Sequence, residues 1–179
     1  MKKYLILLLI VSGLLAIPFI ATKISDEVNW SFSDFLIMGL VLYMLGSSYL
    51  LIDLKTDQTS YKVAIALGLL GAFLLFWVNA AVGIIGSENQ SANSLFGVVF
   101  LVGFTGSILS RFRSRGMYLT MTATSITQAL VPVCAYFTWP PGIISWSPGV
   151  IQVYFLNTGF VLLFAFSALL FKKSSLTIS

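Results

Sequence analysis

The chain contains no histidine and a single cysteine, Cys134. Without histidine, no site in the chain can use the side chain that most often serves as general base and as metal ligand. A single cysteine cannot form a disulfide within the chain, and it leaves no ligand set for a structural zinc site. We therefore expect neither a metal nor a cofactor.

Charge is also scarce. Only 9% of the 179 residues are charged, whereas 58% are hydrophobic. Soluble domains carry about 25% charged residues, so lipid must cover much of the surface of this chain. The net charge of +4 comes from basic residues that are spread over short, separate segments. They form no continuous basic stripe, which argues against nucleic acid as a partner and favours the lipid bilayer.

Six segments are long and apolar enough for membrane helices, each of which needs about 20 apolar residues. We predict an all-α fold: a polytopic six-helix transmembrane bundle that forms a single transmembrane domain over residues 1–179. No suitable cleavage site follows the first segment, so we expect it to be a retained helix and not a signal peptide. The fourth is short and glycine-rich, and we expect it to take its first turn from the preceding loop. The predicted helices span residues 4–21, 32–52, 63–85, 92–109, 117–137 and 148–171.

The distribution of basic residues predicts the orientation of these helices. Cytoplasmic segments of membrane proteins carry an excess of Lys and Arg. Of the 10 basic residues, all except Lys23 fall on one side of the predicted bundle. Both termini are therefore predicted to be cytoplasmic. The residues on that side are Lys2, Lys3, Lys55, Lys62, Arg111, Arg113, Arg115, Lys172 and Lys173.

The most distinctive stretch is Trp77–Asn93, at the end of the third predicted helix and in the loop after it. One interpretation is a polar site at the outer mouth of the bundle, completed by two acids of the first outer loop. The other is that Asn79 bonds a neighbouring helix while the loop residues cap helices and meet water. We predict a bonded, buried Asn79 and a partly buried Glu88. The candidate outer site consists of Asn79, Glu88, Asn89, Asn93, Asp26 and Glu27.

The pattern W-x-N-x-AVGIIGSE-N, formed here by Trp77–Asn89, resembles a segment of an uncharacterised family of small bacterial integral membrane proteins. The similarity extends to Glu27–Trp30 and to Arg111–Met117, and so it would cover most of the chain. The resemblance implies a multi-pass protein of the bacterial inner (cytoplasmic) membrane. It implies no activity, and no functional residue can be carried over from it.

A second candidate site lies within the membrane. The fifth predicted helix carries threonines and a glutamine at helical spacing, followed by Pro132. This stripe is compatible with the lining of a cavity or pathway, and equally with the buried, hydrogen-bonded side of a packed helix. The candidate intramembrane polar face consists of Thr120, Thr124, Thr127, Gln128 and, on the sixth helix, Asn157.

The aromatic, uncharged loop over residues 138–147 is typical of an aromatic belt in the headgroup layer, with a docking surface as the alternative. The chain lacks H-E-x-x-H, G-x-S-x-G and Walker sequences. The leading hypothesis is therefore a non-enzymatic accessory or interaction protein, with a second copy or another membrane protein as its partner. The alternative is a channel or transporter for a small neutral or weakly polar solute. An enzyme built on Glu88 with Asp26 or Glu27 is least favoured, because these acids lack a base partner.

Overall fold

The computed structural model describes residues 2–24, 29–54 and 56–176. Within these residues the chain is all-α, with six α-helices and one short 3-10 helix. The helices divide into two compact units, Met1–Asp57 and Gln58–Ser179, which we call unit 1 and unit 2. Unit 1 is a helical hairpin, and unit 2 contains the remaining four α-helices.

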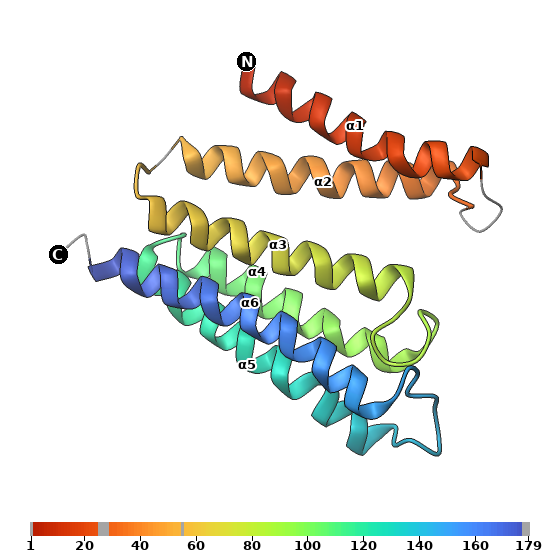
Figure 1. Cartoon of the computed structure of the whole chain (residues 1–179). Helices are drawn as coiled ribbons and strands as arrows, with labels where there is room; N and C mark the ends of the chain where they lie inside the picture. Colours follow the sequence, from red (N-terminus) through yellow and green to blue (C-terminus); the bar gives the residue numbers. More distant parts are fainter. Residues whose placement is uncertain (1, 25–28, 55, 177–179) are drawn as a thin grey trace. The chain divides into compact units, whose positions relative to one another are not determined.

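Unit 1 consists of α1 (Lys2–Ile24) and α2 (Phe32–Asp53), which pack against each other as an antiparallel pair (Figure 1). The start of α2 is capped by Ser31 and Asp34. The Ser31 hydroxyl accepts from the backbone N–H of Asp34 at 3.4 Å, and the Asp34 carboxylate accepts from the N–H of Ser31 at 2.7 Å. This reciprocal pair satisfies donors that the first turn would otherwise leave free.

The two ends of unit 1 are joined by an ion pair between Lys3 and Asp53, whose nitrogen and oxygen lie 2.7 Å apart. Within the hairpin, α1 buries only Val11 and α2 buries only Met38. Its other described apolar side chains are exposed or half-buried, as expected of helices that lipid surrounds.

Unit 2 is built around α5 and α6. Helix α6 packs against both α3 and α5, and α5 packs in turn against α4 (Figure 1). The rings of Tyr61 on α3 and Phe171 on α6 meet edge-on with their centroids 5.0 Å apart. The elements of unit 2 are α3 (Thr59–Ala81), the 3-10 helix η1 (Ser91–Leu95), α4 (Phe96–Leu109), α5 (Ser114–Thr138) and α6 (Val150–Leu176).

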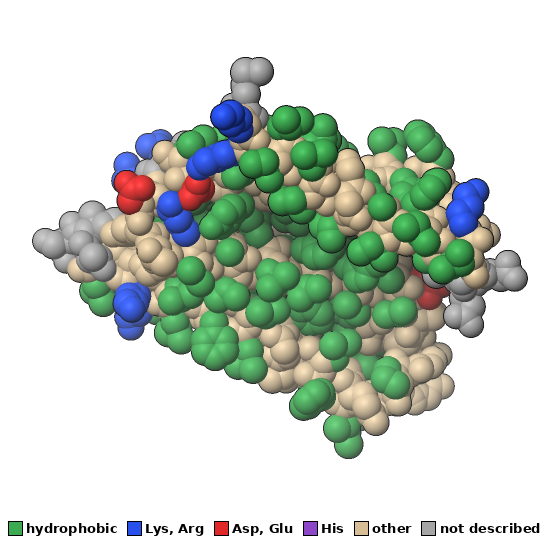
Figure 2. Space-filling model, turned by 45° about the horizontal axis from the view of Figure 1, so that its top comes forward, with side chains coloured by type: hydrophobic (Ala, Val, Ile, Leu, Met, Phe, Trp, Pro, Cys, Tyr) green, Lys and Arg blue, Asp and Glu red, His purple; other side chains and the backbone are tan. Residues whose placement is uncertain are grey.

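Five segments of the described residues are long and apolar enough to cross a membrane: α1, α2, α3, η1 together with α4, and α6. Helix α5 has 25 residues, but its threonines, serines and Gln128 make it less apolar. Figure 2 shows hydrophobic side chains spread across the visible face, with the charged side chains toward its left and right sides. By helix length and hydropathy, the chain is a multi-pass membrane protein.

Within the described residues the predicted all-α class and the six helices are confirmed, and five segments qualify as membrane spans. Several helix boundaries differ from the prediction: α3 begins at Thr59 and not at 63, and α6 ends at Leu176 and not at 171. Helix α3 ends at Ala81 and not at 85, because Gly83 and Gly86 adopt left-handed φ angles of 75° and 74°. Helix α6 begins at Val150 and not at 148, since Gly149 has a φ of 146°. Helix α5 begins at Ser114, three residues earlier than predicted. The turn before α4 is the 3-10 helix η1, as expected for a fourth helix that takes its first turn from the loop.

Candidate functional site

Asn93 organises the loop between α3 and α4. Its Oδ1 accepts from the N–H groups of Ile84 at 3.1 Å and Ile85 at 2.9 Å. Its Nδ2 donates to the carbonyls of Ile85 at 3.2 Å and Ser87 at 2.7 Å. Because acceptors surround the amide nitrogen and donors surround the amide oxygen, the hydrogen bonds show which way the side-chain amide is turned. Asn93 is buried, so this predicted site residue holds the loop together and does not face a ligand.

The glycines and isoleucines of this loop also have structural roles. A Cβ on Gly83 would lie 2.6 Å from the carbonyl oxygen of Ser87, so only glycine fits there without a shift of the backbone. Between the two glycines, Ile84 and Ile85 are almost completely buried. The G-I-I-G sequence thus folds the chain back and closes this end of unit 2 with apolar side chains.

Asn79 is half-buried near the end of α3. Its Nδ2 donates to the backbone carbonyl of Asn93 over a long distance of 3.4 Å. Its Oδ1 is buried and has no hydrogen-bond partner among the described residues. The prediction that Asn79 bonds within the bundle is confirmed, whereas its burial is only partial.

The prediction of a partly buried Glu88 is wrong. Glu88 is exposed, and its Oε1 accepts from the Nδ2 of its neighbour Asn89, itself exposed, at 3.1 Å. The physical reason is that Asn93 and the two isoleucines fill the interior of the loop, which leaves residues 87–89 on its outer side. Asp26 and Glu27 lie outside the described residues.

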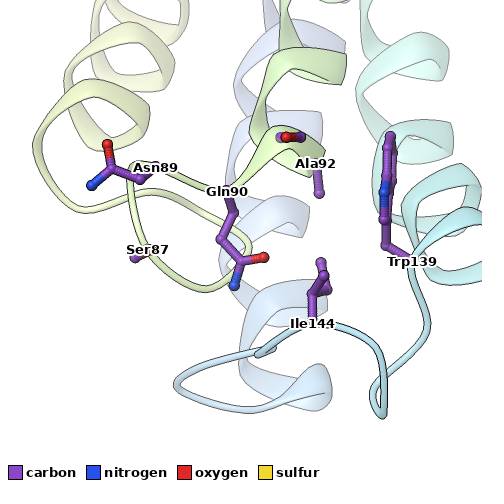
Figure 3. Close-up of a pocket in the computed structure, with 7 residues that line it drawn as sticks. Ser87, Asn89, Gln90, Ala92, Trp139 and Ile144 are labelled. Carbon is purple, nitrogen blue, oxygen red and sulfur yellow. The ribbon is translucent and has the colours of Figure 1, made fainter.

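A pocket of about 290 Å³ opens between this loop and the loop that follows α5. Trp139 and Ile144 give it an apolar wall, and the polar lining comes from hydroxyl and amide groups. Figure 3 shows Gln90 extended between the two loops, whereas the Asn89 amide points away from Trp139. The pocket is lined by Ser87, Asn89, Gln90, Ser91, Ala92, Trp139 and Ile144.

Hydrogen bonds join the two loops beside the pocket. The Nε2 of Gln90 donates to the carbonyl of Ser145 at 2.9 Å, and the N–H of Gly86 donates to the carbonyl of Ser147 at 3.2 Å. The indole N–H of Trp146 donates to the carbonyl of Trp139 at 2.8 Å. The pocket is thus preformed by the fold. We call residues 82–95 and 139–149 the loop end of unit 2.

Among the predicted outer residues that the structure describes, Asn89 alone lines the pocket. Sequence reasoning missed Gln90, Trp139 and Ile144 as neighbours, because they come from loops about 50 residues apart. The aromatic composition of residues 138–147 was a signal for a docking surface, but it did not indicate which other loop lies beside it.

The predicted intramembrane polar face is mostly buried. Thr120, Thr124 and Gln128 are buried on α5, and Thr127 is half-buried. The three threonine hydroxyls donate to carbonyls one turn earlier in α5 at 2.9–3.0 Å. Such bonds satisfy the hydroxyl within its own helix, so these threonines present no free donor to a pathway.

Gln128 and Asn157 form a reciprocal pair between α5 and α6. The Nε2 of Gln128 donates to the Oδ1 of Asn157 at 2.8 Å, and the Nδ2 of Asn157 donates to the backbone carbonyl of Gln128 at 3.1 Å. Gln128 is 0% exposed, and its Oε1 has no partner among the described residues. The pair therefore holds the two helices together and leaves one acceptor unsatisfied inside unit 2.

These arrangements limit the chemistry that unit 2 can carry out. Within the part of the chain that the structure describes, no three His, Cys, Asp or Glu side chains come together as metal ligands. The pocket offers amides, hydroxyls and an indole, which suit recognition by shape and hydrogen bonding.

Comparison of the chain with protein-family models, with curated protein sequences and with solved structures gave no match.

Proposed function

We propose that the chain is a non-enzymatic accessory protein of a bacterial inner membrane, and that it binds a membrane-protein partner or a second copy through the loop end of unit 2. The observation that carries this proposal is the pocket between two hydrogen-bonded loops, with Trp139 and Ile144 as its apolar wall. Protein interfaces favour such sites, in which an aromatic anchor lies beside polar groups that are already in place.

The interior of unit 2 supports the same conclusion. The amides and threonines that could have lined a pathway bond mainly to one another or to their own helices. They contribute to helix packing, for which interhelical hydrogen bonds in membranes provide about 0.6–2 kcal/mol each. At the loop end, by contrast, Ser87, Asn89 and Ser91 are exposed beside the pocket. The sequence resemblance to an uncharacterised bacterial family is compatible with this proposal and adds no activity to it.

The test compares partner retention by variants of the full-length chain after mild solubilisation of the native membrane. Ile144→Glu places a charge in the pocket wall and should abolish a stoichiometric complex that the wild type forms. Ile126→Ala, which changes an exposed residue on α5, is the matched control and should retain the complex. A wild-type chain that is monomeric and without a stoichiometric partner, or a complex unaffected by Ile144→Glu, would contradict the proposal.

A second candidate is a channel or transporter for a small neutral solute. Two buried amide oxygens without a described partner, Oε1 of Gln128 and Oδ1 of Asn79, favour it because a passing solute could donate to them. Vesicles that contain the purified chain should then release glycerol or urea faster than empty vesicles, and Gln128→Leu should remove the increase. Equal release from both vesicle types would reject this candidate.

A further inference from the structure

The turn that joins α4 to α5 has an unusual backbone. Arg111 and Phe112 both have positive φ angles, 50° and 58°, although neither is glycine. A left-handed conformation costs an L-residue about 1–2 kcal/mol, and for a bulky residue such as phenylalanine it is uncommon. Two consecutive examples persist only where the surroundings impose them, and such positions are enriched at functional sites.

The surroundings of this turn come from other helices as well as from the chain next to it. The hydroxyl of Tyr61, on α3, donates to the carbonyl of Phe112. The N–H of Arg111 donates to the carbonyl of Ile108 at 2.9 Å, and the N–H of Phe112 donates to that of Ser107 at 3.3 Å. Because the ring of Tyr61 is itself buried against α6, the turn is anchored to the core of unit 2.

The anchored turn exposes basic and apolar side chains together. Arg111, Arg113 and Arg115 are exposed, and so is Phe112, with 48% of its surface accessible. Leu109, at the end of α4, is 83% exposed. Guanidinium groups on either side of an exposed aromatic ring are the combination that binds phosphate groups while the ring enters the boundary between headgroups and acyl chains.

The charge at this end of unit 2 is not balanced by acidic side chains of the unit. Glu88 is the only acidic residue in 58–179, and it lies between α3 and η1, at the opposite end of α4 from the arginines. Lys172, near the end of α6, lies 5.8 Å from the ring of Tyr118 on α5 and adds to the same end. No acidic side chain of unit 2 therefore neutralises this surface.

We propose that residues 109–115 form a docking surface for anionic phospholipid headgroups. The three arginines bind the phosphates, and Phe112 and Leu109 enter the lipid beside them. A lipid occupant is favoured over an acidic protein segment because the exposed apolar residues follow directly from membrane-crossing α4, which places them at the edge of the bilayer. The strained turn has the role of holding the arginines apart around the aromatic ring.

The experiment measures which phospholipids the full-length chain retains in native mass spectrometry, after reconstitution in discs of phosphatidylcholine mixed with phosphatidylglycerol. We expect the wild type to prefer phosphatidylglycerol. Each Arg→Gln change in the turn should lower the preference about fivefold, the equivalent of about 1 kcal/mol per basic residue near an anionic surface. Lys23→Gln, an exposed cation in unit 1, is the matched control and should leave the preference unchanged.

Further measurements distinguish whether a lipid, a free anion or an acidic protein binds to residues 109–115. Phe112→Ser should weaken retention of both lipids while the preference remains, since it removes the apolar contact and no charge. Displacement of phosphatidylglycerol by inorganic phosphate at equal concentration would indicate a free-anion site, and displacement by poly-glutamate would indicate an acidic protein partner. Either result would overturn the proposal, as would an unchanged preference in the triple glutamine variant. If the triple variant does not fold, the lipid preference of the wild type is measured at rising NaCl concentration. A preference for phosphatidylglycerol that does not fall as salt rises contradicts the proposal.

Discussion

At the scale of single residues, one buried amide determines the loop end of unit 2. Asn93 bonds to two N–H groups and two carbonyls of the loop, and three of these four bonds are buried. A buried polar group without a partner costs about 1–3 kcal/mol, so the four bonds are worth more together than any helix cap in the chain. Asn89, only four residues earlier, is exposed, and within the described part of the chain its side chain bonds to Glu88 alone.

Asn93→Ala should therefore lower the free energy of unfolding by about 3 kcal/mol or more, because it removes the partners of three buried backbone groups, the N–H groups of Ile84 and Ile85 and the carbonyl of Ile85. Asn89→Ala should change it by less than about 0.5 kcal/mol. Reversible unfolding in mixed detergent micelles measures both. Equal losses in the two variants would show that Asn93 does not hold the loop.

The pair formed by Gln128 and Asn157 allows a second test at this scale. Asn157→Leu removes both hydrogen bonds of the pair and should destabilise unit 2 by about 1–3 kcal/mol, since it leaves Gln128 buried without partners. In the double variant Asn157→Leu with Gln128→Leu, the loss in the free energy of unfolding should be smaller than the sum of the losses in the two single variants. The difference, the coupling energy, should be about 0.6–2 kcal/mol. Strictly additive losses in a double-mutant cycle would mean that the two amides do not interact.

At the scale of elements, close packing in unit 2 depends on where its glycines face. On α4, a Cβ added to Gly106 would lie 2.6 Å from Cγ2 and 2.8 Å from Oγ1 of Thr120 on α5. Thr120 is buried and β-branched, so it cannot move aside easily. Gly97, on the same helix, has nothing within 4 Å of the corresponding position.

Gly106→Ala should consequently destabilise unit 2 by about 1–3 kcal/mol through overpacking between α4 and α5. Gly97→Ala should leave stability unchanged or raise it by up to about 1 kcal/mol, because alanine favours the helix. Thermal unfolding of the two purified variants compares them directly. A Gly106→Ala chain as stable as Gly97→Ala would show that α4 and α5 do not pack as described.

The sequence predicted the elements better than it predicted the site. Hydropathy indicated six helices because membrane helices are long apolar runs. The loop after α3 was harder, since the same amides suit a ligand site and a folded turn. Only the geometry shows that Asn93 points inward while Glu88 points outward. The pocket could not be predicted because its walls come from two loops that no local pattern connects.

At the scale of the whole molecule, the unequal distribution of basic residues predicts which loops face the cytoplasm, which the fold alone does not show. Exposed cysteines can report the side on which each loop lies. Ser114 is unsuitable for this purpose, because it is buried and bonds to Ser174 at 3.1 Å. Arg113 in the turn before α5, and Asn89 and Ile143 at the loop end, are exposed and serve instead.

In a Cys134→Ala background, Asn89→Cys and Ile143→Cys should react with an impermeant reagent added to intact cells. Arg113→Cys should react only after permeabilisation, because the basic loops are predicted to be cytoplasmic. Removing Cys134 first is necessary, since it is itself exposed. Labelling of Arg113→Cys from outside would reverse the orientation, and identical behaviour of Arg113→Cys and Ile143→Cys would mean that α5 does not cross the membrane.

The division of the chain into units has a consequence for how such a protein can change in evolution. Unit 1 contains two helices and unit 2 contains four, and both numbers are even. If every helix crosses the membrane, unit 2 begins on the side where unit 1 began. A gene fusion or deletion at the boundary between Asp57 and Gln58 can then add, remove or exchange the hairpin without inverting the four helices that follow.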